Sequence, residues 1–246
     1  MMKYNRVFIL LVPLVFLLSC SLAEKKLIVV LFDASDSTIE EKRRETYVSE
    51  FNDKILSSLQ GGDRVIGDKI ADNPLAQATY PVNLNIPAYS IFGDETERKE
   101  NAQAGRALAS SAALNLFNSQ NREIGKTKIL DSLRLAEQAF ASYPGYRKKI
   151  LVVFSDMIED SDNYSFQDLD LTSDKIAEII KAQGILPDLK GVKVYVSGAT
   201  ASTTGGLKTN KITSIKAFWL AYFSACGASL APSNYGSAII QFEGAG

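Results

Sequence analysis

The chain has 246 residues, of which 46% are apolar, and its formal net charge is −1. A chain of this length and composition can bury the core of one large α/β domain. The charge balance excludes a global basic field, so we expect no nucleic-acid partner. Histidine is absent, and Cys20 and Cys226 are too few to form a cysteine-rich zinc site. Any bound metal should therefore be a hard cation held by oxygen atoms.

The N-terminus carries two basic residues followed by an apolar run, Val7–Leu18. This run is short for a membrane span and typical of a signal peptide. It ends in Leu17-Leu18-Ser19-Cys20, which resembles a bacterial lipobox, although Leu18 stands where a smaller residue is usual. The resemblance implies a signal peptide over residues 1–20, lipidation at Cys20 and a short linker over 21–25. The alternative is an ordinary secretory signal with a chance cysteine.

A lipidated Cys20 would hold the chain at a membrane of the bacterial cell envelope through its acyl chains. Ser21 and Leu22 follow the cysteine, with no aspartate beside it. By resemblance to lipoprotein sorting in diderm bacteria, this favours the outer membrane. Because the linker is short, we expect the domain to lie close to the lipid surface.

The first half of the domain predicts a strand, a helix and a second strand. Lys26–Phe32 is an unbroken apolar run, typical of a strand buried on both faces of a parallel sheet. Ser37 and Glu40 form a capping box, so a helix should begin there. Its buried stripe, at i, i+4 spacing, is Tyr47, Phe51, Ile55 and Leu59. A strand is expected at 64–70, and the prolines of 72–97 predict loops with one or two edge strands.

The second half of the domain continues the alternation of strands and helices. Its predicted elements are, in order, helices at 97–118 and 127–142, a fully apolar strand at 149–155, an acidic loop at 161–174, a helix at 174–183, a strand at 192–196, a helix at 211–225 and a last strand at 238–242. Cys226 ends an apolar helical stretch and is expected to be a small buried residue. This order predicts one α/β domain over 26–246, with a doubly wound, mostly parallel sheet covered by helices on both faces.

Two fully apolar strands each end in an aspartate, Asp33 and Asp156. If these strands are neighbours, both carboxylates lie at one edge of the sheet, where sheets of this class bind ligands. Their like charges repel each other, and a divalent cation is the natural compensation. Ser35 and Ser37 alternate with Asp33 along one loop, and Thr127 opens a predicted helix, so hydroxyl groups can join the carboxylates around an ion.

Three segments together resemble the metal-ion-dependent adhesion site of von Willebrand factor type A domains. Asp33-Ala34-Ser35-Asp36-Ser37 matches the family's D-x-S-x-S motif, and Thr127–Leu133 resembles its second loop. Val152–Asp156 resembles the strand before its third loop, with Met157 in place of the usual glycine. The resemblance covers residues 25 to about 242. It implies Mg²⁺ or Mn²⁺ bound by Asp33, Ser35, Ser37, Thr127 and Asp156, with an acidic side chain of a protein partner completing the coordination.

These observations favour a membrane-anchored binding protein that is not an enzyme. One alternative is a metal-dependent, phosphatase-like hydrolase with Asp33 as nucleophile, although Ser35 stands where such enzymes carry a second aspartate. A domain with a vestigial metal site is another. Ser37 and Thr127 also suit simple helix caps. The acidic side chains after Asp156 are expected to form a solvated rim rather than extra ligands, namely Glu159, Asp160 and Asp162.

Overall fold

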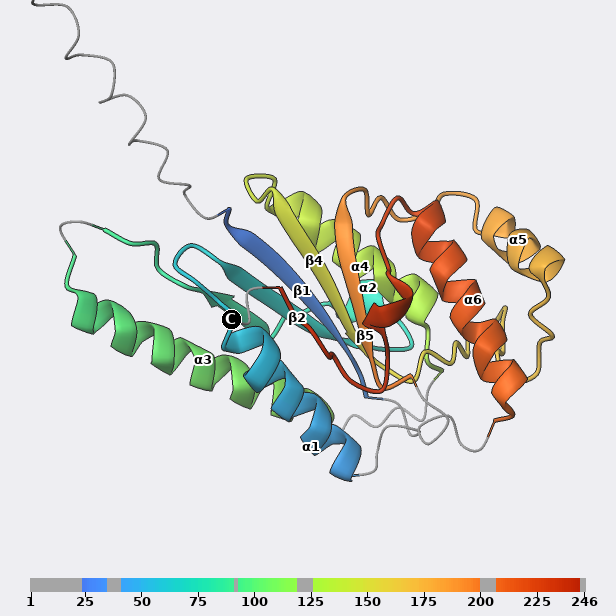
Figure 1. Ribbon diagram of the computed structural model, residues 1–246, viewed down its shortest axis with the longest axis horizontal. Coiled ribbons are helices and arrows are strands. Elements are labelled where there is room, and N and C mark those ends of the chain that lie inside the picture. The colour runs from blue at the N-terminus through green and yellow to red at the C-terminus, as the bar shows by residue number, and fades with distance from the viewer. Residues whose placement is uncertain (1–23, 35–40, 91–92, 119–125, 200–206, 244–246) are drawn as a thin grey trace, which may run out of the picture.

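The computed structural model describes residues 24–34, 41–90, 93–118, 126–199 and 207–243 (Figure 1). Its strands are β1 Lys26–Asp33, β2 Arg64–Ile70, β3 Val82–Asn85, β4 Lys148–Phe154, β5 Val192–Ser197 and β6 Tyr235–Gly236. Its helices are α1 Glu41–Glu50, the π-helical turn η2 Phe51–Leu56, α2 Pro74–Gln77, α3 Glu95–Asn118, α4 Ile129–Ser142, α5 Ser173–Ala182, α6 Thr209–Ala225 and the 3₁₀ turn η3 Pro232–Asn234.

The strands form one sheet in the order β3-β2-β1-β4-β5-β6. β1 pairs in parallel with β2 on one side and with β4 on the other, and β3 is an antiparallel edge strand. The chain moves outward from β1 through β2 to β3 and then returns to β4 on the opposite side of β1. The sheet is therefore doubly wound and mostly parallel, as predicted, and its strand order reverses between β1 and β4.

Alternate residues of β1 enter two separate cores, one on each face of the sheet. Leu27, Val29 and Leu31 pack with residues of α4, α5 and α6. Ile28, Val30 and Phe32 pack with residues of α1, η2 and α3, which lie side by side on the other face (Figure 1). Because β1 is covered on both faces, its run of apolar residues is fully buried, as the sequence predicted.

Phe32, the last apolar residue of β1, fixes the elements around the end of this strand. Its ring contacts Phe51 edge-on, with the centroids 5.4 Å apart, and Phe117 edge-on at 5.7 Å. It stacks on Phe154 of β4 at 5.4 Å. The predicted stripe on α1 and η2 is confirmed, since Tyr47, Phe51, Ile55 and Leu59 are all buried. The predicted helix start at Ser37 lies outside the described residues.

Two expectations about the elements are corrected. The segment 72–97 contains the edge strand β3, as expected, but also the short helix α2. This helix was not predicted, because the prolines of the segment indicate loops. The predicted last strand at 238–242 is wrong, because β6 pairs with β5 earlier in the chain and is only Tyr235–Gly236. Ile239 and Phe242 are buried three residues apart, whereas Ile240 is 79% exposed, and this spacing does not fit the two-residue period of a strand.

Across the described ranges, no helix has the length and apolar character to cross a bilayer.

Candidate functional site

The two aspartates that follow the apolar strands lie side by side at the point where the strand order reverses. The register pairs Phe32 of β1 with Phe154 of β4, so Asp33 leaves its strand next to Ser155, directly before Asp156. Asp33 is fully buried and Asp156 is 2% exposed. The strands are thus neighbours, as a site shared by both carboxylates requires. The assignment of these carboxylates as metal ligands remains a prediction.

A short segment after β4 holds both carboxylates. The Ser155 hydroxyl donates a hydrogen bond of 2.6 Å to Oδ2 of Asp33, and the backbone N–H of Met157 donates to Ser155 Oγ at 2.9 Å. The N–H of Ile158 donates to Oδ1 of Asp156 at 3.0 Å. Hydrogen bonds to a charged acceptor are strong, so they fix the orientation of both acids. In the sequence Ser155 is recognisable only as the end of a strand, so this role could not be predicted.

Met157 occupies the position where the resemblance expects glycine. Its φ of 63° lies in the left-handed region, which glycine adopts without strain and other residues rarely adopt. The Met157 side chain is fully buried, and its carbonyl oxygen accepts a 2.8 Å hydrogen bond from Nε1 of Trp219. Core packing and this bond stabilise the turn. The backbone therefore takes the left-handed conformation here although the residue is not glycine.

Thr127 lies just before α4, which begins at Ile129 and not at Thr127 as expected. The N-cap of α4 is Lys128, so the structure does not use Thr127 as the cap. Instead, the Thr127 carbonyl oxygen accepts hydrogen bonds from the N–H of Ile129 at 3.1 Å and of Asp160 at 3.0 Å. The second bond joins the Thr127 segment to the loop that follows Asp156, so two of the three candidate loops are in direct contact.

The acidic residues after Asp156 fall into two groups. Asp160 and Asp162 are exposed, as a solvated rim requires, and Asp162 pairs with Lys126 and Lys128 at 2.6 and 3.0 Å. Hydrogen bonds from these lysines lower the pKa of Asp162 to about 2. Glu159 does not belong to the rim, because it is only 1% exposed and its Oε2 accepts a 3.0 Å hydrogen bond from the N–H of Leu130 at the start of α4. Burial raises the pKa of Glu159 to about 7.

Tyr47 of α1 brings a phenol to the same place. Its hydroxyl is buried and makes no hydrogen bond within the described part of the chain. Burial raises the pKa of this phenol, and the negative charges of Asp33 and Asp156 raise it further. Gly198, just after β5, has a φ of 107°, and a Cβ on it would lie 2.0 Å from the Tyr47 oxygen. Only glycine therefore leaves room for this hydroxyl.

The donor groups brought together by the described residues suit a hard cation. They are two buried carboxylates, with the Ser155 and Tyr47 hydroxyls next to them, and no histidine or thiolate. No cluster of three or more His, Cys, Asp or Glu side chains with metal-binding placement occurs in the described ranges. Ser35 and Ser37, the remaining predicted ligands, and the predicted lipidation site Cys20 lie outside those ranges. Cys226 is buried, and burial raises its pKa to about 12, as expected for a residue that serves packing.

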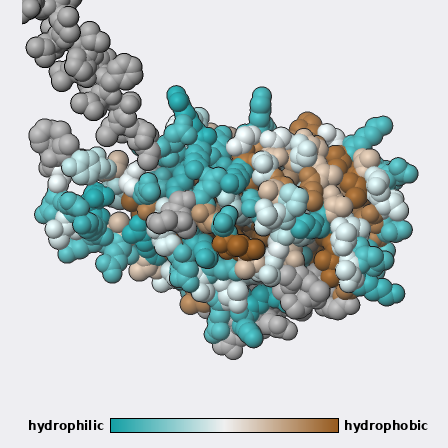
Figure 2. All heavy atoms as spheres, in the orientation of Figure 1, coloured by the Kyte–Doolittle hydropathy of each residue, from teal (hydrophilic) through white to brown (hydrophobic). Residues whose placement is uncertain are grey.

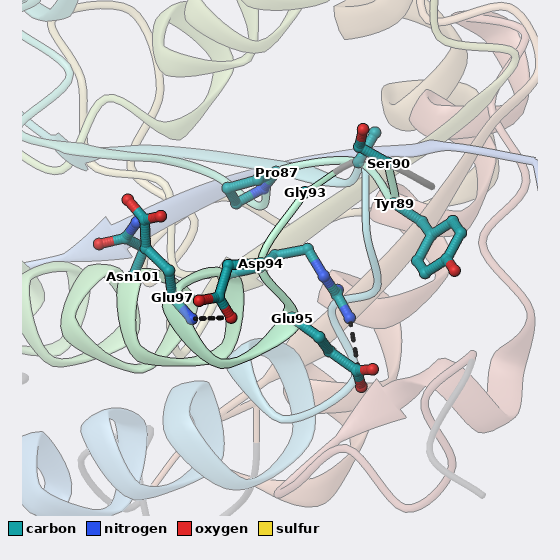
Figure 3. Close-up of a pocket in the computed structure, with 10 residues that line it drawn as sticks. Pro87, Tyr89, Ser90, Gly93, Asp94, Glu95, Glu97 and Asn101 are labelled. Carbon is teal, nitrogen blue, oxygen red and sulfur yellow. Dashed lines mark hydrogen bonds and ion pairs between the residues drawn. The ribbon is translucent and has the colours of Figure 1, made fainter.

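A hollow of about 280 Å³ lies at the opposite edge of the sheet, after β3 (Figure 3). The start of α3 in this hollow is already capped, because Oδ1 of Asp94 accepts hydrogen bonds from the N–H groups of Thr96 at 2.7 Å and Glu97 at 3.3 Å. Arg98 pairs with Glu95 at 3.9 Å. The charged side chains of Asp94, Glu95 and Arg98 are therefore engaged with neighbouring groups of the hollow, and the strand ends at β1 and β4 remain the stronger candidate.

Comparison with known proteins gives structural likeness only. No protein-family model and no curated protein sequence matches the chain. Among solved structures, a von Willebrand factor type A protein from Catenulispora acidiphila is 14% identical, over 85% of this chain and 44% of that one, with a TM-score of 0.39. The pilus adhesin SpaC from Lactobacillus rhamnosus GG, in an open conformation, is 13% identical, over 87% of this chain and 28% of that one, with a TM-score of 0.47. The chain thus spans less than half the length of either structure.

The Tyr47 hydroxyl provides a test of the geometry around the two carboxylates. Because a buried hydroxyl without a partner is costly, Tyr47→Phe should raise the free energy of unfolding by about 1 kcal/mol in the presence of chelator. Urea unfolding measures this change. Tyr80→Phe is the matched control, since its hydroxyl donates a 3.1 Å bond to the Leu135 carbonyl oxygen and its removal should cost about 1 kcal/mol. A loss of stability in Tyr47→Phe would contradict the geometry.

The buried Glu159 predicts a pH-dependent stability. Its folded-state pKa of about 7 lies above its ordinary value of 4.5, so the unfolded chain binds fewer protons between these values. Stability should therefore fall as pH rises from about 4.5 to about 7, by up to on the order of 3 kcal/mol, and then level off. Urea unfolding across this range should show that Glu159→Gln lacks the decline. Asp162→Asn should retain it, and an identical decline in both variants would exclude Glu159 as its source.

Proposed function

We propose that this chain is a membrane-anchored binding protein whose von Willebrand factor A-like domain holds a protein partner through Mg²⁺ or Mn²⁺. The observation that carries the proposal is the burial of Asp33 and Asp156 side by side at the ends of β1 and β4. Two like charges in a buried site are unfavourable, and a bound cation removes that cost. The D-x-S-x-S pattern from Asp33 to Ser37 supports the same conclusion.

In this proposal the ion is held by Asp33, Ser35, Ser37, Thr127 and Asp156. The chain supplies few charged ligands and several neutral ones, so the bound ion keeps part of its charge and attracts an acidic side chain from a partner. Ser155 and the backbone N–H of Ile158 orient the two carboxylates before the ion binds. Such preorganisation lowers the cost of ordering the site. The role is binding and not catalysis.

The anchor in this proposal is a lipid on Cys20, which places the domain at the cell envelope, with the outer membrane favoured in a diderm cell. The sequence before β1 supports it through the lipobox-like Leu17-Leu18-Ser19-Cys20. The carboxyl ends of β1 and β4 lie at the edge of the sheet opposite to the one where β1 begins (Figure 1). The proposed metal site therefore lies at the end of the sheet opposite to the start of β1, to which the anchor is joined.

Metal binding should appear as stabilisation of the native state. Millimolar Mg²⁺ or Mn²⁺ should raise the Tm of the wild-type chain, since a ligand at 100 times its Kd adds about 2.7 kcal/mol, and each kcal/mol is worth about 2–4 °C in a domain of this size. Asp33→Asn and Asp156→Asn should abolish the shift.

Asp162→Asn is the control for this experiment, because Asp162 is exposed and already paired with lysines, so the variant should keep the metal shift. Differential scanning calorimetry measures all these variants. A wild-type Tm that does not respond to either metal would contradict the proposal and support a vestigial site.

Partner capture separates binding from hydrolysis. Wild-type chain on a resin should retain an envelope protein in Mg²⁺ and release it in chelator, while Ser35→Ala should retain about tenfold less because one ligand of the ion is lost. The same preparation should not hydrolyse p-nitrophenyl phosphate. Turnover that requires Mg²⁺ and disappears in Asp33→Asn would instead support the phosphatase-like alternative and contradict the proposal.

A further inference from the structure

Basic side chains gather at the edge of the sheet where the parallel strands begin. Lys148 and Lys149 open β4, and Lys193 is the second residue of β5. Lys25 and Arg147 directly precede β1 and β4, and Lys190 lies two residues before β5. We call this surface the basic edge and define it as Lys25, Arg147, Lys148, Lys149, Lys190 and Lys193. Lys25, Arg147 and Lys190 are exposed, and the others are half-exposed. Figure 2 shows hydrophilic side chains along the upper side of the molecule, above the starts of β1 and β4.

The acids near this surface do not neutralise it. Glu243 pairs with Lys148 and Lys193, each at 2.5 Å, so one carboxylate is shared between two cations. Asp63 is buried and pairs with Lys26, which is also buried and is not part of the basic edge. Glu24 and Asp188 are exposed and offset only part of the charge of the six cations, and Asp188 also accepts a backbone hydrogen bond from Lys190. An excess of positive charge therefore remains at this edge, although the whole chain carries a net charge of −1.

Two tyrosines lie within the same surface. Tyr143 and Tyr146 follow α4 and contact each other edge-on, with their centroids 6.4 Å apart, and both are half-buried. The guanidinium of Arg64, the first residue of β2, lies 4.4 Å from the centre of the Tyr143 ring. Tyrosine beside lysine and arginine is the combination found where proteins meet the polar layer of a bilayer, because each side chain has an apolar body and a polar end.

We propose that the basic edge docks on the anionic surface of the membrane that holds the chain. This inference rests on the lipid anchor at Cys20 in the proposed function. Only residues 21–25 separate that cysteine from β1, and five extended residues span at most about 18 Å. Lys25 lies against Gly62 at the start of β2, so the linker reaches the domain at this surface. Cations held this close to anionic headgroups lie well within the range of their electrostatic attraction.

The consequence is a fixed orientation of the domain. With the basic edge on the headgroups, β1 and β4 run away from the bilayer and present Asp33 and Asp156 at the far side. A lipid anchor alone leaves the domain free to rotate about the linker. Electrostatic contact at this edge adds the restraint that keeps the proposed metal site directed at a partner.

Lysine footprinting on vesicles tests the orientation. Full-length chain purified from membranes is reconstituted into vesicles of phosphatidylcholine, or of equal parts phosphatidylcholine and phosphatidylglycerol, and acylation of Lys25 and Lys149 is followed by mass spectrometry. Because each cation near an anionic surface contributes about a fivefold preference, labelling should slow at least about fivefold on the anionic vesicles. Molar salt should remove the difference.

Two double variants with equal charge change complete the test. Arg147→Glu with Lys190→Glu should abolish the difference between the vesicles, whereas Lys42→Glu with Lys208→Glu, exposed residues at the starts of α1 and α6, should keep it. Equal labelling of the wild type on both vesicles overturns the proposal, as does failure to float with anionic vesicles. Protection by soluble polyglutamate but not by vesicles also overturns it, in favour of an acidic protein partner. Metal-dependent melting is measured without vesicles, so its result tests the proposed metal site independently of this docking proposal.

Discussion

Two carboxylates buried side by side are the constraint on which this structure depends. Asp33 and Asp156 follow strands whose apolar residues are covered on both faces, so neither acid reaches bulk water. The cost of a buried charge is met by hydrogen bonds or by an opposite charge. The segment from Ser155 to Ile158 supplies hydrogen bonds to both carboxylates, and it does so from the turn that begins where β4 ends.

The surrounding core explains why that turn keeps its shape. Phe32 and Phe154 stack on one face of β1 and β4 and hold the two strand ends together. On the other face, Trp219 of α6 donates to the Met157 carbonyl oxygen and retains a backbone conformation that a non-glycine residue rarely adopts. Loss of either contact would loosen the turn and, with it, the orientation of the carboxylates. Packing on both faces of the sheet thus stabilises a polar arrangement at its edge.

The sequence predicted the elements that depend on strong local patterns. Both apolar strands and the stripe from Tyr47 to Leu59 could be found because their burial periods are unambiguous. The helix α2 and the segment after β6 could not, because a four-residue helix and a two-residue strand carry too few residues for a period to show. In those segments the structure is decided by tertiary contacts.

The candidate site also combines residues that local patterns predict with residues that only tertiary contacts bring into place. The positions of Asp33 and Asp156 followed from strand ends, and their adjacency followed from the chain order expected of a doubly wound sheet. The roles of Ser155 and Tyr47 depend on the register between strands and on the packing of α1 against the sheet, which no local pattern encodes. Glu159 was misjudged because an acid in a polar loop is usually solvated, whereas here the chain turns it toward the start of α4.

Glu159 also shows how the candidate loops act together. Its carboxylate accepts from the N–H of Leu130, and three residues earlier in the chain the Thr127 carbonyl oxygen accepts from the N–H of Asp160. Both hydrogen bonds join the start of α4 to the loop after β4. The start of α4 donates one of them, and the loop donates the other. A shift of the loop that carries Asp156 must therefore break at least one of them or carry α4 along. The start of α4 and the loop that carries Asp156 are consequently linked by two hydrogen bonds, which join the segments of Thr127 and Asp156 at this edge of the sheet.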